Sequence, residues 1–191
     1  MKSPWRLIPH ETREGSYNLS FDARLLEKRF PQTVLRFYSW SRRCVSYGYF
    51  QNPPLNPKWP AYRRVTGGGT VFHDKDLTYS LIYPRDSYLP WSVRRSYCEI
   101  HRVIQEALQS LGIATFQCTE EKRGGFCFTS PVPGDLLYQE RKIAGAAQRR
   151  MGGHLLHQGS ILVEPLGVDR LQLSDAMVEA FGRKYQVTFE S

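Results

Sequence analysis

A lysine lies among small and apolar residues in the segment RKIAGAAQ, residues 141–148. The alanines and glycine that follow Lys142 would leave room for a ligand beside its ammonium group. If the side chain is partly buried, the ammonium becomes a specific electrostatic partner for that ligand. The structural alternative is a lysine whose stem packs along an edge strand while its charge stays in water.

Three consecutive glycines follow an expected strand in the segment RRVTGGGTVFHD, residues 63–74. Such a run lets the backbone approach a ligand closely and leaves amide N–H groups to hold an anion or a carbonyl. Arg64 offers a planar fork for phosphate or carboxylate. A flexible glycine hairpin is the alternative, and His73 could serve structure alone. The sequence contains neither a P-loop pattern nor a Rossmann glycine pattern, which excludes the ordinary nucleotide-binding folds.

The four cysteines, Cys44, Cys98, Cys118 and Cys127, are dispersed along the chain without a Cys-x-x-Cys pair. They are too few for a disulfide scaffold and have no histidine at zinc-ligand spacing, so buried thiols are expected. By its local pattern alone, Cys127 between two phenylalanines is a small hydrophobic residue.

A histidine and a serine lie on either side of a glycine in the segment HLLHQGSIL, residues 154–162. Glycine would let this strand pass close to a ligand, which makes His157 and Ser160 candidates to face one. A serine hydrolase is not favoured, because the sequence lacks a Gly-x-Ser-x-Gly elbow.

Alternating short strands and a few helices must position these residues. Apolar spacing predicts helices over 18–30, ended by Pro31, and over 93–111, with Ser92 as N-cap and Gly112 as C-cap. One or two final helices are expected within 166–181. Strands are expected at 5–9, 34–40, 45–50, 62–66, 70–72, 77–83, 114–118, 125–128, 135–138, 142–148 and 155–163. The sum is an α+β single domain with a mixed, largely antiparallel sheet and packed helices.

The composition is that of a soluble globular domain. With 191 residues, 41% hydrophobic and 23% charged, the chain is neither disordered nor rich enough in apolar runs to predict a membrane span. It has no signal-peptide core at its start, so a cytoplasmic protein is expected. The net charge of +8 permits nucleic acid, an anionic membrane or an acidic partner.

Three segments, taken in order, resemble the lipoate–protein ligase and octanoyltransferase family, whose fold is shared with the biotin ligases. They are residues 63–74, 141–148 and 156–162. Residues 35–40 and 45–48 also look like family segments. The resemblance covers about residues 1–165 and implies a biotin/lipoate ligase-like catalytic domain.

The resemblance also implies an activity and a site. Family members attach a lipoyl or octanoyl group in amide linkage to a lysine of lipoyl carrier domains, found in 2-oxoacid dehydrogenases and the glycine cleavage H protein. Lys142 matches the lysine that contacts the acyl carbonyl, where a fixed ammonium stabilises developing negative charge. The acyl or nucleotide pocket is expected to include Arg64, Gly67, Gly68, Gly69, Val71, His73, Asp135, Gly145 and His157.

Two chemistries occur in this family. Its ligases activate lipoate with ATP and Mg²⁺, whereas its cysteine-type octanoyltransferases take octanoate from acyl carrier protein through an acyl-cysteine. The glycines 67–69 resemble the ligases, because the transferases often carry arginine at the third position. Against this, Gly134 stands before Asp135 where the ligases have an asparagine that helps to hold the nucleotide. Cys127 falls where the transferases carry their nucleophile, and a nearby Lys142 ammonium would favour its thiolate.

The leading hypothesis is therefore octanoyl transfer from acyl carrier protein through Cys127, with Lys142 in the same site and no cofactor or metal. ATP-dependent lipoylation with ATP and Mg²⁺ is the alternative, and a non-catalytic lipoate- or RNA-binding module is the third. A single catalytic domain over residues 1–191 without an accessory C-terminal domain is expected. Its partners would be lipoyl domains and acyl carrier protein, which are generally acidic, rather than a membrane or a nucleic acid.

Overall fold

The computed structural model describes residues 3–120 and 131–190. The strands are β1 (Trp5–Arg13), β2 (Val34–Trp40), β3 (Cys44–Tyr47), β4 (Ala61–Arg63), β5 (Val71–His73), β6 (Asp76–Pro84), β7 (Phe116–Gln117), β8 (Leu136–Tyr138), β9 (Arg141–Met151), β10 (His154–Leu162) and β11 (Phe189–Glu190). The helices are α1 (Gly15–Lys28), α2 (Val93–Ser110) and α3 (Arg170–Tyr185), with a short 3-10 turn, η1 (Glu164–Leu166).

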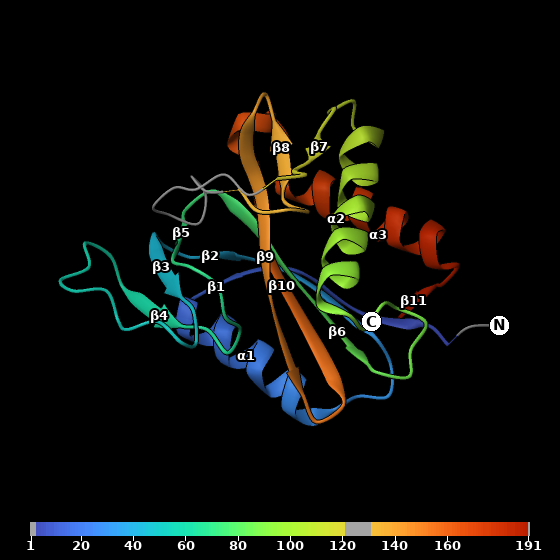
Figure 1. Ribbon diagram of the computed structural model, residues 1–191, viewed down its shortest axis with the longest axis horizontal. Coiled ribbons are helices and arrows are strands. Elements are labelled where there is room, and N and C mark those ends of the chain that lie inside the picture. The colour runs from blue at the N-terminus through green and yellow to red at the C-terminus, as the bar shows by residue number, and fades with distance from the viewer. Residues whose placement is uncertain (1–2, 121–130, 191) are drawn as a thin grey trace.

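The strands form two sheets (Figure 1). The larger has the order β11-β1-β2-β6-β10-β9-β8-β7, and the smaller has the order β4-β3-β5. In the larger sheet β1 runs parallel to β2 and β11, whereas the remaining pairs are antiparallel. The expected α+β domain with a mixed, largely antiparallel sheet is confirmed.

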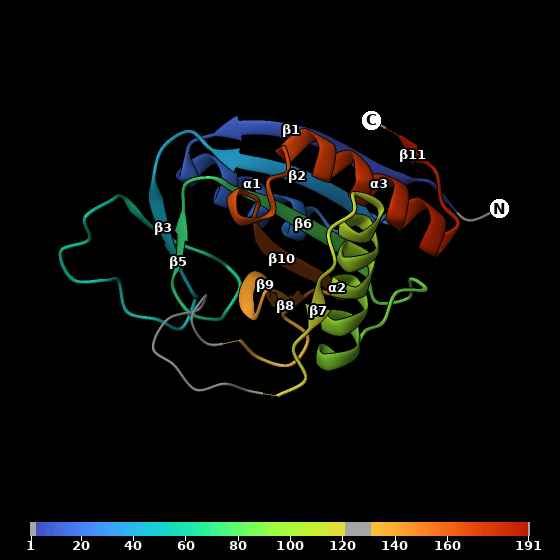
Figure 2. The same cartoon turned by 90° about the horizontal axis from the view of Figure 1, so that it is seen from above.

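Helices cover both faces of the large sheet (Figures 1 and 2). Successive strand residues point to opposite faces, and on β2 Leu35 joins the main core with α2 and α3 whereas Val34 packs with α1. On β6, Leu81 and Ile82 divide in the same way. The central strands are therefore apolar on both sides, which explains why β2 and most of β6 are buried along their length.

The helix boundaries follow local chemistry. The Ser92 hydroxyl accepts a hydrogen bond from the Arg95 N–H at the start of α2, as predicted, and Gly112 follows the helix with φ +78°. Helix α1 begins at Gly15, earlier than expected, and ends at Lys28 with Arg29 in the left-handed conformation. A single final helix, α3, begins after the Asp169 cap.

The structure shortens some expected strands. The strand predicted over 45–50 ends at Tyr47, because the chain turns at 48–51, where the Gln51 N–H donates to the Gly48 carbonyl oxygen at 3.0 Å. Gly48 itself packs against the carbonyl oxygen of Gly68, where any side chain would collide. The strand expected at 125–128 lies outside the described residues. Among the helices of the described residues, none has the length and apolar character needed to cross a bilayer.

Candidate active site

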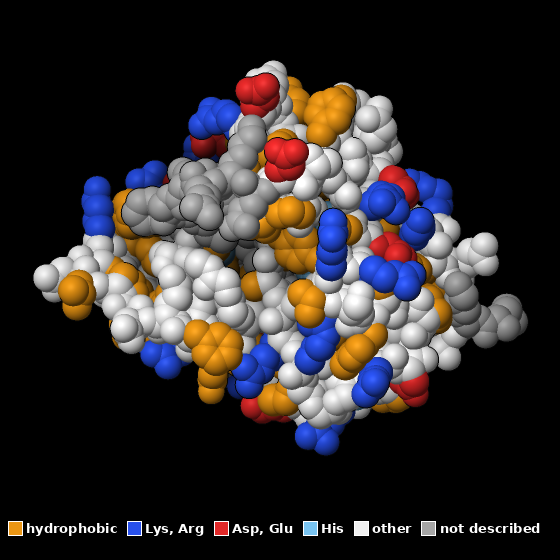
Figure 3. Space-filling model, in the orientation of Figure 1, with side chains coloured by type: hydrophobic (Ala, Val, Ile, Leu, Met, Phe, Trp, Pro, Cys, Tyr) orange, Lys and Arg blue, Asp and Glu red, His pale blue; other side chains and the backbone are white. Residues whose placement is uncertain are grey.

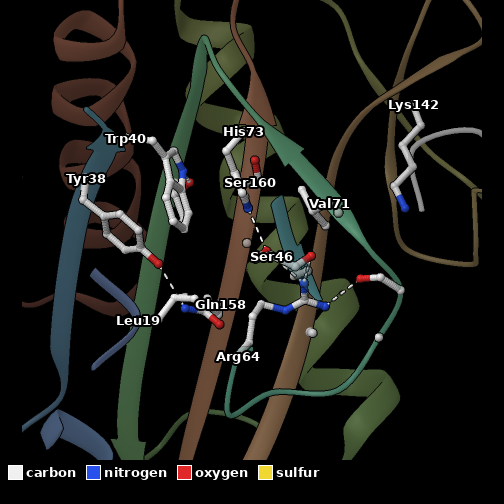
Figure 4. Close-up of a pocket in the computed structure, with 17 residues that line it drawn as sticks. Leu19, Tyr38, Trp40, Ser46, Arg64, Val71, His73, Lys142, Gln158 and Ser160 are labelled. Carbon is white, nitrogen blue, oxygen red and sulfur yellow. Dashed lines mark hydrogen bonds between the residues drawn. The ribbon is translucent and has the colours of Figure 1, made fainter. Parts of the chain in front are cut away.

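A cavity with about 470 Å³ of empty space, part of it open to solvent, lies between the two sheets (Figure 4). Its lining is mostly apolar or small. The residues that border it are Leu19, Tyr38, Trp40, Ser46, Arg64, Gly68, Gly69, Val71, His73, Thr78, Lys142, Gly145, Ala146, Ala147, Gln158, Gly159 and Ser160. Figure 4 shows Lys142 on the opposite side from Tyr38 and Leu19, so the cavity is elongated between a charged end and an apolar end.

Arg64 holds the glycine loop. One terminal nitrogen of its guanidinium donates to the backbone oxygen and the hydroxyl of Ser46, each at 2.9 Å. The other donates to the carbonyl oxygens of Gly67 at 2.8 Å and Gly69 at 2.7 Å. Gly68, between those two carbonyls, has φ +81°, a conformation that favours glycine. Arg64 therefore fixes the shape of the cavity wall.

His73 links that wall to a buried carboxylate. Its Nε2 lies 2.7 Å from the Ser46 hydroxyl and its Nδ1 lies 2.8 Å from Asp76, while its ring stacks on Trp40 at 3.9 Å between centroids. Burial alone would raise the pKa of Asp76, but His73 and the Ser160 hydroxyl, which donates to it at 2.5 Å, hold that pKa below its usual value. A series of hydrogen bonds therefore runs from Asp76 through His73 and Ser46 to Arg64, and it stiffens the glycine loop.

Lys142 is 7% exposed and lies 2.7 Å from the buried carboxylate of Asp135. Asp135 also accepts hydrogen bonds from the Tyr97 hydroxyl at 2.5 Å and from the Val132 N–H at 2.8 Å. The Tyr97 oxygen in turn accepts from the Ala146 N–H at 2.9 Å. A charged lysine in this position is oriented by a carboxylate that two further donors hold in place.

Two glycines make room around this ion pair. A Cβ on Gly145 would lie 2.8 Å from the Lys142 Nζ, so only glycine leaves the ammonium its place. Gly134 has φ +96°, and a Cβ there would lie 2.8 Å from the Tyr97 ring and 3.1 Å from the Cys98 Sγ. The side chain of Tyr97 therefore fills the space next to position 134.

His157 lies behind the cavity wall, fully buried. Its Nδ1 accepts from the Gln148 amide at 3.0 Å, and its Nε2 lies 2.9 Å from the Tyr79 hydroxyl. Burial lowers its pKa well below the usual value, and the charges of His101 and Arg150 act in the same direction. His157 is therefore a neutral ring whose two nitrogens both have hydrogen-bond partners, and it supports the cavity wall from behind.

A buried polar cluster anchors helix α1 to the glycine loop. The Gln158 amide donates to Asp22 at 2.7 Å, and its oxygen accepts from the Thr66 hydroxyl at 2.9 Å. Asp22 also lies 2.7 Å from the guanidinium of Arg36, and both side chains are completely buried. Gln158 borders the cavity, so this cluster fixes a wall residue from behind.

Most of the residues expected from the sequence meet in one place. Those that border the cavity are Arg64, Gly68, Gly69, Val71, His73, Lys142 and Gly145. Asp135 and His157 are buried behind these residues, Gly67 lies in the glycine loop without bordering the cavity, and Cys127 lies outside the described residues. Their assigned roles stay predictions.

Sequence reasoning missed the residues that hold the site from behind. The apolar spacing of the long helix includes Tyr97 as one of its positions and gives no sign of another role. The one available signal was that Tyr97 lies four residues before His101, on the same face of the helix. Asp76 and Asp22 carried no motif, and only their burial beside charged partners shows their importance. Gln158 and Ser160 were within a noted segment, but their partners are distant in sequence. Among the described residues, no group of three or more His, Cys, Asp or Glu side chains could hold a metal ion.

An elongated, mainly apolar cavity with a buried ammonium at one end is suited to an acyl chain with a reactive carbonyl. The fold and the site together define an enzyme domain that handles acyl groups. The chain belongs to the family described as lipoyl protein ligase A/B catalytic domain, which matches residues 14–185.

Characterised relatives carry the name octanoyltransferase LipM. The chain is 33% identical to LipM of Bacillus subtilis (strain 168) over 193 residues, which cover 89% of this chain and 69% of the relative. It is also 33% identical to LipM of Staphylococcus aureus (strain NCTC 8325 / PS 47) over 193 residues, covering 90% and 70%.

Solved structures confirm the fold. A lipoate-protein ligase A bound with ATP aligns with a TM-score of 0.82 at 21% identity, covering 99% of this chain and 88% of that one. A bi-partite lipoate protein ligase system from Thermoplasma acidophilum, described with its E2 lipoyl domain, aligns with a TM-score of 0.76 at 20% identity, covering 100% and 87%. A biotin acetyl coenzyme A carboxylase synthetase from Helicobacter pylori aligns with a TM-score of 0.55 at 12% identity, covering 94% of this chain and 74% of that one.

Proposed function

We propose that this protein transfers an octanoyl group from the thioester of acyl carrier protein to a lysine of a lipoyl carrier domain, through an acyl-cysteine at Cys127. The observation that carries the proposal is the buried Lys142–Asp135 pair at the end of an apolar cavity. The names of the relatives support octanoyl transfer, and the lipoyl domain described with a ligase neighbour supports the kind of acceptor. Lipoyl domains of 2-oxoacid dehydrogenases or the glycine cleavage H protein are the candidate acceptors.

The reaction has two acyl transfers. The thiolate of Cys127 attacks the octanoyl carbonyl, a new thioester forms, and the donor leaves as a thiolate that takes up a proton. The neutral amine of the acceptor lysine then attacks the acyl-cysteine, the amide forms, and the Cys127 thiol is regenerated as the amine loses its proton. No oxidant, nucleotide or metal is consumed.

Lys142 acts on the carbonyl in both steps. Each attack places negative charge on the acyl oxygen, and a preoriented ammonium stabilises that charge without having to reorganise. Asp135 and the glycine at position 145 keep the ammonium where the cavity begins. The apolar end, near Leu19 and Tyr38, takes the hydrocarbon chain.

The surroundings of Gly134 favour transfer over ATP-dependent ligation. The resembling ligases hold their nucleotide with an asparagine at this position, and here an added Cβ would meet the Tyr97 ring. This chain therefore lacks the amide of that asparagine, and the Tyr97 ring occupies the space that its side chain would need. The same ring hydroxyl holds Asp135, so the space cannot be opened without disturbing the ion pair.

Intact-mass spectrometry of the purified chain mixed with octanoyl acyl carrier protein tests the mechanism. The expected result is one added octanoyl group that hydroxylamine removes, present in the Cys98→Ala control and absent in Cys127→Ala. Full activity of Cys127→Ala would show that the nucleophile is wrong. Lipoate-dependent release of pyrophosphate from ATP would establish the ligase reaction instead.

The same mixture tests the expected domain organisation. If the 191 residues act without an accessory domain, adding a lipoyl domain alone discharges the octanoyl enzyme and raises the mass of the acceptor by one octanoyl group. A requirement for a second subunit would contradict that expectation.

A further inference from the structure

The positive charge of the chain comes from one stretch of sequence. Residues 28–73 contain eight basic residues (Lys or Arg) and no acidic residue (Asp or Glu). The remaining residues contain 18 basic and 18 acidic residues, so their charges cancel. This acid-free segment builds β2, β3, β4 and the glycine loop. Five of these eight cations lie in the small sheet and the segments that flank it, namely Arg42, Arg43, Lys58, Arg63 and Arg64.

Within that segment, several cations are already neutralised. Arg36 pairs with Asp22, and Arg64 is used by the glycine loop. On the surface, Arg42 lies 3.1 Å from Glu14 and Arg43 lies 2.9 Å from Asp74. These four arginines already have partners within the protein, so they offer little charge to another molecule.

Other cations on this side lie over aromatic rings. Arg63 lies 5.5 Å from the Tyr47 ring, and Arg149, which β9 contributes from outside the segment, lies 4.7 Å from the Tyr49 ring. Among the described residues, neither Arg63 nor Arg149 has a carboxylate partner. Stacking on a ring leaves the edge of a guanidinium available to an acceptor.

Arg149 borders an exposed aromatic surface beside the cavity, and Arg63 lies at the end of β4, directly before Arg64 and the glycine loop. Phe50 is 84% exposed and Tyr49 is 43% exposed, and the Phe50 ring would lie 4.0 Å from a Cβ on Gly67. Ala147, two residues before Arg149 on β9, lines the cavity. We call Tyr49, Phe50, Arg63 and Arg149 the rim patch. In Figure 3, the surface over β3 and β4, at the left, shows orange and blue side chains.

We propose that the rim patch is the docking surface for the lipoyl carrier domain, and that it binds an acidic face of that domain next to the acceptor lysine. This inference rests on the proposed function. Exposed aromatic rings with unpaired arginines and no acidic neighbour in the segment are complementary to a negatively charged protein surface. Phe50, whose ring contacts the Tyr49 ring, supplies apolar area that the fold of the isolated chain leaves in water.

The position of the rim patch favours the acceptor domain, rather than the acyl donor, as its partner. The acceptor lysine reaches the acyl carbonyl only with its own side chain, so the surface of its domain must come close to the cavity mouth. The rim patch borders the glycine loop and β9, the two walls on either side of that mouth. A surface farther away would leave the amine short of the acyl group.

The test uses the octanoyl enzyme, prepared in advance, and measures single-turnover transfer at increasing lipoyl-domain concentration. Arg63→Glu/Arg149→Glu is expected to raise the half-saturating concentration about tenfold or more while the limiting rate changes less than about twofold. Phe50→Ala is expected to raise it as well. Salt should weaken the wild type and have little effect on the double variant.

The matched control is Arg102→Glu, which makes the same charge change on the exposed face of α2 and should leave the half-saturating concentration unchanged. An acidic residue beside the acceptor lysine, changed to lysine, should restore binding to the double variant. If the double variant instead slows enzyme acylation by the donor and leaves acceptor saturation unchanged, the patch serves the donor and the proposal is wrong. If wild-type octanoyl enzyme never transfers to a lipoyl domain, the proposed function fails rather than the docking site.

Discussion

Among the described residues, two buried ion pairs that join an aspartate to a lysine or arginine lie near the cavity, and they share a separation of 2.7 Å. Arg36 and Asp22 lie behind the wall, completely enclosed, and the Arg36 guanidinium also donates to the oxygens of Asn18. Lys142 and Asp135 lie at the wall itself, and the lysine borders empty space.

The difference between the pairs is one of cation chemistry. A guanidinium offers several donors in a fixed geometry, and around Arg36 its two terminal nitrogens bind the Asp22 carboxylate and the oxygens of Asn18. An ammonium is a compact charge with rotatable donors, so Lys142 can remain paired with Asp135 and still turn toward a substrate oxygen. The first pair holds structure, and the second is the pair that we propose takes part in the reaction.

The largest expected effect is on stability, at the enclosed pair. Arg36→Met leaves the Asp22 carboxylate buried without its cation, which should cost about 3–5 kcal/mol in the free energy of unfolding. Lys142→Met should cost clearly less, because water can enter the cavity and solvate Asp135. Urea titration of both variants checks this, and equal losses would remove the distinction between the pairs.

The next effect is on rate, at the cavity pair. Lys142→Met should lower kcat/KM for octanoyl transfer about 100–1,000-fold, the usual consequence of removing one oxyanion donor. Lys75→Met, which removes an exposed lysine, serves as the control. Transfer rates measured over a range of lipoyl-domain concentrations below saturation give this ratio, and a near-wild-type Lys142→Met would show that the site is misplaced.

Acid should lower the stability of the protein through His101, which contacts the backbone next to Asp135 of the cavity pair. Burial lowers the pKa of His101 from 6.5 to about 4, although its Nδ1 contacts the Gly134 carbonyl at 2.6 Å. The folded protein keeps this ring neutral while the unfolded chain takes up a proton below pH 6.5, so stability falls as pH drops from 6.5 toward 4. Between pH 7 and pH 5 the loss from His101 should be about 2 kcal/mol.

Urea unfolding at both pH values measures this loss, and His101→Gln should show a correspondingly smaller difference between them. An unchanged difference in that variant would mean that other groups, such as His157, account for the acid sensitivity.

The smallest expected effect is at Tyr97. Tyr97→Phe removes the hydroxyl between Asp135 and the Ala146 N–H, which should cost about 1 kcal/mol of stability and lower the transfer rate about tenfold. Tyr83→Phe removes a hydroxyl bonded to the Pro90 carbonyl and should affect stability alone. Rates normalised to folded protein distinguish the two variants, and equal rates would make Tyr97 purely structural.

The sequence predicted more of the cavity wall than of its supports. Periodicity and glycine patterns located β2, β6, α2 and the glycine loop, because each has a local signature in the chain. The family resemblance then assigned Lys142. The supports depend on contacts between distant residues, such as Gln158 with Asp22, and no local pattern encodes such a pair. The guanidinium of Arg64 also holds the carbonyls of its own loop, and this contact of a side chain with nearby backbone has no signature in the glycine pattern.

The small sheet has a consequence for the motions of the protein. Its outer strands, β4 and β5, have three residues each, yet the sheet and its connections carry Ser46, Arg64, Val71 and His73. Short ladders open at low free energy, so their amide protons should exchange with solvent sooner than those of β6 and β10. An acyl chain in the cavity would contact both sheets at once, and its arrival should be visible as slower deuterium uptake in the small sheet.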